Sequence, residues 1–216
     1  LLVKVCSYIT DPVTTTDELI PSGETSSYRS NPERLSEFAL SRRDPQYVGR
    51  SKVMRQIERD REAGKALPEE VMKVYEALTK AGVANDPANT DIGSTIFANM
   101  PGDGSAREQA ASCQRVMGAS ANFAKQYATK RYRSNCINWG MTPFLVENPE
   151  VFELGDYIFV PGIREAVLEN KASFSAYAVK PDGTVTEFPV STGALTEAER
   201  QIIADGCLIN YYRNNQ

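Results

Sequence analysis

The sequence contains no histidine. Histidine is the commonest general acid or base and the commonest metal ligand, so its absence excludes a Ser-His-Asp triad and an imidazole zinc site. The cysteines are too far apart to form a C-x-x-C pair, so neither a metal or cluster site made by this chain alone nor a disulfide framework is predicted. Their apolar or small neighbours predict buried thiols in a reducing, cytoplasmic setting. The cysteines are Cys6, Cys113, Cys136 and Cys207.

Long apolar runs and a strong charge imbalance are also missing. No segment approaches the length of a membrane span, and no signal-peptide pattern opens the chain. The 24 basic and 28 acidic residues give a formal net charge of −4, which argues against nucleic acid or an acidic membrane as a partner. The first residue is Leu1, and residues 2–5 resemble a strand interior. We therefore expect a C-terminal fragment of a larger protein.

The composition is that of a globular protein that can bury a sizeable core, with 216 residues, 41% hydrophobic and 24% charged. Segments typical of strands alternate with segments typical of helices, and there is no internal repeat. We therefore expect an α/β domain over residues 1–216. Lys180-Pro181-Asp182-Gly183 between two apolar runs predicts a hairpin turn. Strands are expected at 2–9, 92–100, 157–160, 172–179 and 184–190, and helices at 33–40, 122–133 and 196–206.

Residues 45–84 are expected to form a helical insert, because apolar residues recur there at helical spacing. The residues that should share a buried face are Val53, Met54 and Ile57 in one helix, and Val71, Val74, Tyr75 and Leu78 in the next. Trp139 is expected in the core, the usual place for an aromatic ring.

A glycine-rich turn leads into a helix at Gly102-Asp103-Gly104-Ser105-Ala106-Arg107-Glu108-Gln109-Ala110-Ala111. Glycine lets a ligand approach the backbone closely, and the N–H groups at a helix start favour anions. Arg107 adds a planar fork of donors suited to a carboxylate or a phosphate. The segment therefore predicts a site for a small polycarboxylate or a phosphate, with Ser105 at its centre.

A structural interpretation of the same residues remains open. Ser105-x-x-Glu108 is the pattern of a capping box, in which the two side chains satisfy N–H groups of the first helical turn. The Gly-x-Gly lead-in and the interposed arginine favour the ligand site, because a cap needs neither.

The order of these motifs resembles the swivel domain of the aconitase family. That family has a G-x-G-S-S-R-E-H-A-A motif, then a glycine-led strand and a "GLLP" segment, to which residues 102–111, Gly118 and residues 140–144 are similar. Thr15-Thr16-Asp17-Glu18-Leu19-Ile20-Pro21 resembles the family's T-T-D-H-I or T-D-Q-I-I-P element, and Glu187 to Tyr212 resembles its closing strand and helix. The resemblance covers most of the chain, and residues 45–84 have no clear counterpart.

The resemblance implies a three-layer β/β/α swivel domain that closes over a larger domain holding a [4Fe–4S] cluster. It implies a lyase that dehydrates and rehydrates a hydroxy di- or tricarboxylic acid, with no activity in the isolated domain. The family's catalytic base corresponds to Ser105, and its substrate-binding residues correspond to Arg107, Arg29, Ala106 and Asp17.

Two positions depart from the family motif. Ala106 replaces the second serine and removes a hydroxyl that would contact substrate, and Gln109 replaces the histidine. These departures indicate a hydratase whose substrate differs from citrate or isocitrate, or an enzyme that has lost activity. Two alternatives stay open: a separately encoded small subunit of an isopropylmalate-isomerase-type enzyme, and a non-catalytic anion-binding or regulatory module.

Overall fold

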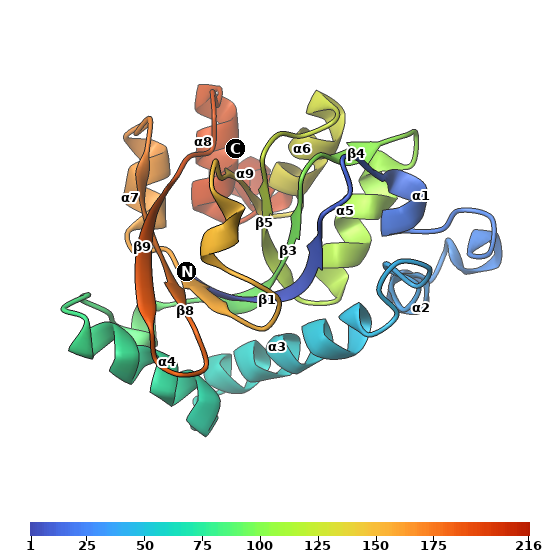
Figure 1. The fold of residues 1–216 in the computed structure, drawn as a ribbon. Coiled ribbons are helices and arrows are strands. Elements are labelled where there is room, and N and C mark those ends of the chain that lie inside the picture. The colour runs from blue at the N-terminus through green and yellow to red at the C-terminus, as the bar shows by residue number, and fades with distance from the viewer.

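The computed structural model describes residues 1–216 and is built on one seven-stranded sheet (Figure 1). The strand order is β6-β5-β3-β1-β7-β8-β9. The first four of these are parallel, and β7, β8 and β9 run antiparallel to their neighbours. The strands are β1 Leu2–Ile9, β3 Ile92–Ala98, β5 Ala119–Ala124, β6 Thr142–Leu145, β7 Tyr157–Phe159, β8 Phe174–Val179 and β9 Val185–Val190.

The sheet curls until its two edges meet. Leu145, at the end of β6, forms an antiparallel bridge with Ser191, just after β9, through hydrogen bonds of 2.7 and 3.1 Å. The concave side encloses a cluster of 14 buried hydrophobic residues rich in phenylalanine. Edge-to-face contacts join Phe152 to Phe97 and Phe123. The curl therefore produces two β layers from one sheet.

Helices cover the convex side and form the third layer. A cluster of 31 buried hydrophobic residues lies between this side and the helices. The longer helices of this layer are α3 Tyr47–Glu62, α4 Glu69–Lys80, α5 Arg107–Val116 and α6 Lys130–Asn138. The predicted three-layer β/β/α arrangement is confirmed. Shorter helices are α1 Thr16–Leu19, α2 Pro32–Ser36, α7 Ile163–Leu168, α8 Glu197–Asp205 and α9 Leu208–Asn214.

Local signals with a specific turn or cap chemistry were predicted correctly. The turn at 180–183 joins β8 to β9, and Gly183 adopts a positive φ of 87°. Thr196 caps α8 through a reciprocal capping box with Glu199, and the helix ends at Gly206 in the left-handed conformation. Each of these two signals involves only neighbouring residues, and the tertiary structure preserves both.

The prediction of a helix over 122–133 was wrong. Residues Ala119–Ala124 form the buried strand β5, and the helix α6 begins only at Lys130, after the cap Thr129. The apolar run was short enough for either element, and its position between two parallel strands decided the outcome. Trp139 was also assigned wrongly to the core, since it is 39% exposed.

The segment 45–84 supplies part of the core. α3 packs against β1 and β3, and α4 packs against β8. The expected face of α4 is buried, as are Met54 and Ile57 of α3, whereas Val53 points away from the core and is 56% exposed. The helices thus cover the convex side of the sheet, below it in Figure 1.

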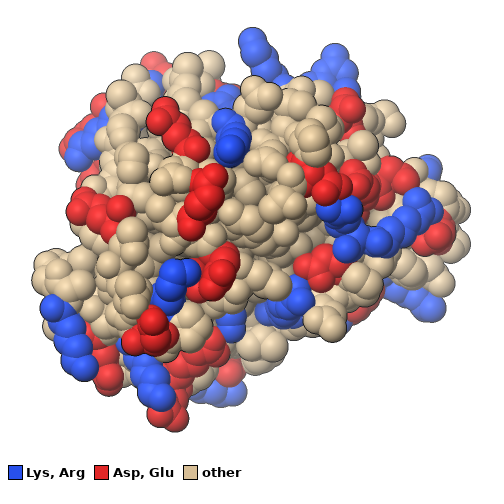
Figure 2. Space-filling model, in the orientation of Figure 1, with Lys and Arg blue, Asp and Glu red and all other residues tan.

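The surface carries charges of both signs. On the face shown in Figure 2, acidic and basic side chains are intermixed, with no extended patch of either sign. No helix has both the length and the apolar character needed to cross a bilayer.

Replacing Leu78 tests whether α4 belongs to the cooperative core. Leu78 is fully buried, so Leu78→Ala should lower the free energy of unfolding by about 2–5 kcal/mol in a denaturant titration. The exposed Val53 of α3 is the control, and Val53→Ala should change stability by no more than about 0.5 kcal/mol. Equal effects of the two substitutions would mean that α4 is not part of the unfolding unit.

Candidate functional site

The glycine-rich turn lies beyond the carboxyl end of β3. β4, Pro101–Asp103, pairs in parallel with the two-residue strand β2, Thr14–Thr15. This pairing places the start of α1 beside the start of α5, and α1 contacts both β4 and α5 (Figure 1). In open α/β sheets, ligands bind at the edge where parallel strands end. The turn is therefore at the expected edge of the sheet.

Two glycines are required by the path of this turn. Gly102 has a φ of 99°, and a Cβ built on it would lie 2.4 Å from ring carbons of Tyr132. Gly104 has a φ of 135°, and its Cβ would lie 2.2 Å from Oγ1 of Thr16. Both positions combine a backbone conformation that favours glycine with a lack of space for any side chain. The turn is thus fitted tightly between α6 and α1.

The capping-box interpretation of Ser105 was wrong. α5 begins at Arg107 with Ala106 as its N-cap, and no side chain caps it. The carboxylate of Glu108 accepts a hydrogen bond of 2.9 Å from the indole Nε1 of Trp139. Ser105 is exposed, and its hydroxyl takes part in none of the hydrogen bonds of the chain. The hydroxyl is free at the start of a helix whose first N–H groups have no side-chain partner.

Arg107 has an unusual environment. Its Nε is buried and has no hydrogen-bond partner, and its guanidinium forms no ion pair. Most buried donors in folded proteins are satisfied, because leaving one without a partner costs about 1–3 kcal/mol. An arginine offers five N–H donors in a planar fork, which suits a carboxylate or a phosphate. The arrangement can bind an anion next to Ser105.

Asp17 is hydrogen-bonded to groups of the segment that follows it. Its carboxylate accepts hydrogen bonds from the backbone N–H of Ser22 at 3.1 Å and from Nη1 of Arg42 at 2.8 Å. These contacts, that of Ser22 first, lower the pKa of the carboxyl group below its ordinary value. Arg42 also binds Glu24 at 3.1 Å. Asp17 thus ties the segment after α1 together, and the sequence offered no signal for Arg42 beyond its charge.

Arg29 is exposed and makes no hydrogen bond or ion pair. It lies between a short 3-10 helix, Ser26–Tyr28, and α2. Because α2 packs against α5, the loop that carries Arg29 lies beside the helix that begins at Arg107. The structure therefore brings Ser105, Ala106 and Arg107 together in one turn, with no direct contact from Arg29.

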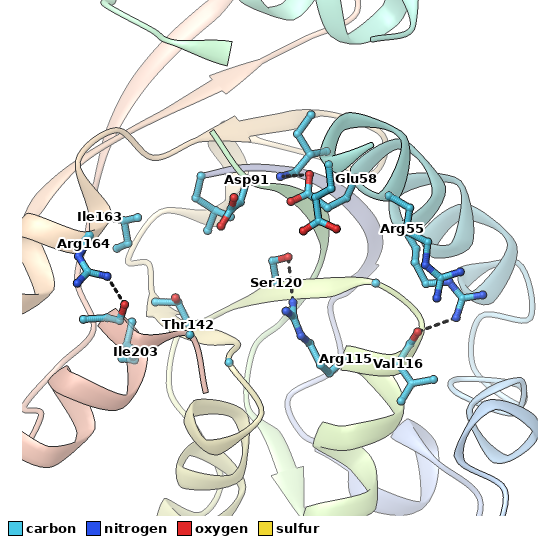
Figure 3. A pocket seen from close by; sticks show the side chains of 18 of the residues that line it. Arg55, Glu58, Asp91, Arg115, Val116, Ser120, Thr142, Ile163, Arg164 and Ile203 are labelled. Atoms are coloured by element: carbon cyan, nitrogen blue, oxygen red, sulfur yellow. Dashed lines mark hydrogen bonds between the residues drawn. The ribbon is translucent and has the colours of Figure 1, made fainter. Parts of the chain in front are cut away.

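A separate cavity lies at the other end of the parallel strands. Its volume is about 730 Å³, and it opens at the amino ends of the parallel strands, next to Ser120 of β5 and Thr142 of β6 (Figure 3). Three of its four arginines donate to backbone carbonyls: Arg55 to that of Val116 at 2.8 Å, Arg115 to that of Ala119 at 3.0 Å, and Arg164 to that of Ala204. The fourth, Arg59, makes no side-chain hydrogen bond or ion pair. Neither Ser105 nor Arg107 lines it. The cavity is separate from the glycine-rich turn.

No group of three or more cysteine, aspartate and glutamate side chains lies close enough together to hold a metal ion. Three cysteines are buried singly in the core, and Cys207 is half-buried. An iron–sulfur cluster bound to these residues does not fit the structure.

Two comparisons with known proteins found similar chains. The chain is 29% identical over 133 residues to the methanogen homoaconitase small subunit of Methanocaldococcus jannaschii, a match that covers 61% of this chain and 69% of that protein. A crystal structure of 3-isopropylmalate dehydratase from the same organism has the same fold. Its TM-score is 0.54 at 20% identity, with 100% of this chain and 95% of the other covered. The chain is thus similar in sequence to a homoaconitase small subunit and shares the fold of a 3-isopropylmalate dehydratase structure. No family model matches the chain.

The glycine-rich turn is open to solvent, since Asp103, Gly104 and Ser105 are exposed. Neither Ser105 nor Arg107 lines the cavities of about 730, 590 and 330 Å³.

The fit of the turn can be tested at Gly104. Gly104→Ala places a Cβ against Thr16 in a conformation that favours glycine, and should cost about 1–3 kcal/mol of unfolding free energy. Gly23→Ala is the control, because a Cβ there would meet nothing within 4 Å. Thermal or denaturant unfolding of the two variants measures the difference, and equal stability would show that the turn can move aside.

Proposed function

We propose that this domain supplies Ser105 as the proton acceptor and Arg107 as a carboxylate ligand to a hydro-lyase acting on a hydroxy di- or tricarboxylic acid. The observation that carries the proposal is the buried, unpartnered Nε of Arg107, two residues from a free serine hydroxyl. A purely structural arginine would be expected to use its donors within the fold. The sequence similarity to a homoaconitase small subunit supports the same reaction class.

The local field makes Ser105 a better base. A serine hydroxyl is a poor base until its alkoxide is stabilised. The start of α5 is equivalent to about half a positive charge, and Arg107 adds a full one nearby. Positive groups that are fixed in advance favour the state in which Ser105 Oγ has lost its proton. That oxygen would then accept the proton from the carbon next to the bound carboxylate.

The remaining site residues, Arg29, Ala106 and Asp17, have different roles in the proposal. Arg29 is free to bind a second carboxylate of the substrate, and Ala106 offers only its backbone N–H, where a serine would offer a hydroxyl as well. Asp17 would act by holding its segment against the turn, since its oxygens already bind Ser22 and Arg42. Ala106 and Gln109 are consistent with a substrate other than citrate or isocitrate.

A partner is required for turnover. Relatives of the aconitase type carry a [4Fe–4S] cluster, which when bound supplies a Lewis acid for the substrate hydroxyl. This chain offers no ligands for such a cluster, so the cluster would be held by a larger domain of the same protein or by a separate large subunit. We therefore propose that the 216-residue chain alone is inactive.

Removing the serine hydroxyl tests the role of the base. In the complex with its partner, Ser105→Ala should lower kcat by about 100-fold or more and leave KM nearly unchanged. Ser112→Ala, on the same helix but away from the turn, should keep the normal rate. Steady-state kinetics with a series of hydroxy di- and tricarboxylic acids measures both. Normal turnover by Ser105→Ala would rule out the serine as the base.

Arg107→Lys tests the carboxylate ligand. Lysine keeps the charge but cannot form the bidentate pair, so KM and the calorimetric Kd for the same acids should rise about tenfold. Arg115→Lys is the matched control, since Arg115 lies at the far end of α5. Calorimetry also addresses the alternative of a non-catalytic module. Such a module would bind the acids through Arg107, and its complex with a cluster-loaded partner would not turn them over.

A further inference from the structure

A buried polar network lies directly beneath the glycine-rich turn. Tyr132 of α6 is fully buried, and its hydroxyl oxygen accepts hydrogen bonds from Nε2 of Gln114 at 2.9 Å and from Nδ2 of Asn122 at 3.2 Å. The same Nδ2 lies 3.0 Å from Oε1 of Gln114. The network thus joins three elements, because Gln114 is on α5 and Asn122 is on β5.

The amino end of α6 also contacts the turn. The Tyr132 ring occupies the space where Gly102 would have a side chain, with 2.4 Å from the ring to a built Cβ. Thr129, the N-cap of α6, donates from Oγ1 to the carbonyl of Gly102 at 3.2 Å. Next to it, the N–H of Ala128 donates to the carbonyl of Pro101 at 3.0 Å. Three contacts therefore hold the backbone of Pro101 and Gly102, just before Ser105.

Stability alone does not account for this network. Oδ1 of Asn122 is buried without a partner, so the network is not fully satisfied. A partly satisfied buried network is generally less favourable than well-packed apolar side chains of the same volume. Burial raises the pKa of Tyr132 well above its ordinary value, so the hydroxyl stays protonated and neutral. The network therefore acts through geometry.

We propose that Tyr132 is a positioning residue. Its hydroxyl, fixed by Gln114 and Asn122, orients the ring against Gly102. This contact sets the position of Ser105 relative to Arg107, which lies on the same helix as Gln114. The inference rests on the proposed function, since the geometry that it preserves is that of the proposed base and carboxylate ligand. In enzymes, a displacement of about 1 Å at a reacting group can cost 100-fold in rate.

The test removes the hydroxyl and keeps the ring. In the complex with its partner, Tyr132→Phe should lower kcat about tenfold or more with KM nearly unchanged. The matched control is Tyr127→Phe. Tyr127 is half-buried, and its hydroxyl donates to the carbonyls of Asn122 and Phe144. Its ring lies 6.3 Å from that of Tyr132, but the atoms nearest to a Cβ built on Gly102 all belong to Tyr132. A structural role alone would lower the melting temperature of both variants and leave kcat unchanged in both.

A second measurement does not depend on activity. Hydrogen exchange of the amides of residues 102–106 should be faster in Tyr132→Phe than in the wild type and unchanged in Tyr127→Phe. Thr129→Val, which removes the hydrogen bond to Gly102, should show the same acceleration.

The outcomes separate this inference from the proposed function. Unchanged exchange in both Tyr132→Phe and Thr129→Val would overturn the positioning role, whatever the enzyme does. A wild-type complex without hydro-lyase activity would overturn the proposed function, and the exchange result would still decide whether Tyr132 positions the turn. An active wild type with normal kcat in Tyr132→Phe would overturn the inference alone.

Discussion

The absence of space for a side chain at Gly102 is the constraint on which the site depends. The backbone there runs against the ring of Tyr132, and two residues later Gly104 runs against Thr16. With both sides fixed, the chain can enter α5 along only one path, which leaves Ser105 at the surface and Arg107 in the first helical turn. A β4 pairing of three residues would be too short to hold this path alone. The tertiary contacts of α1 and α6 are therefore what makes the turn rigid.

A rigid turn explains how an unpaired guanidinium can persist. In a mobile segment, Arg107 could rotate to a carbonyl or a carboxylate and satisfy its buried Nε. In this turn it does not, although Glu108 is adjacent, because that carboxylate is engaged by Trp139. The cost of about 1–3 kcal/mol for one unsatisfied donor is small compared with the packing of the surrounding core, so the fold can tolerate it. A ligand that carries a carboxylate would remove that cost on binding.

Much of the fold could be predicted from the sequence, but the contacts that shape the site could not. The hairpin at Gly183 and the cap at Thr196 depend on neighbouring residues, and the buried face of α4 depends on a regular spacing. Both kinds of signal can be read from the sequence alone. The second half of β5, from Asn122, was mistaken for a helix because the sheet, not its own sequence, determines its conformation. The resemblance to the aconitase family placed Ser105 and Arg107 in the motif, but the partnership of Asp17 with Arg42 joins residues 25 positions apart. Such a pair has no local signature.

The arginines at the two ends of the parallel strands differ in their hydrogen-bond partners. At the amino edge, Arg55, Arg115 and Arg164 donate to backbone carbonyls near the carboxyl ends of α5 and α8, where the helix dipole favours a positive charge. Those guanidinium groups are used in stabilising the fold, although they line the cavity at that edge. At the carboxyl edge, Arg107 sits at the start of a helix, where the dipole disfavours its charge, and its Nε has no partner. Under the proposed function, a carboxylate from outside the chain would complete the balance of charge at Arg107. We therefore propose the open turn as the ligand site.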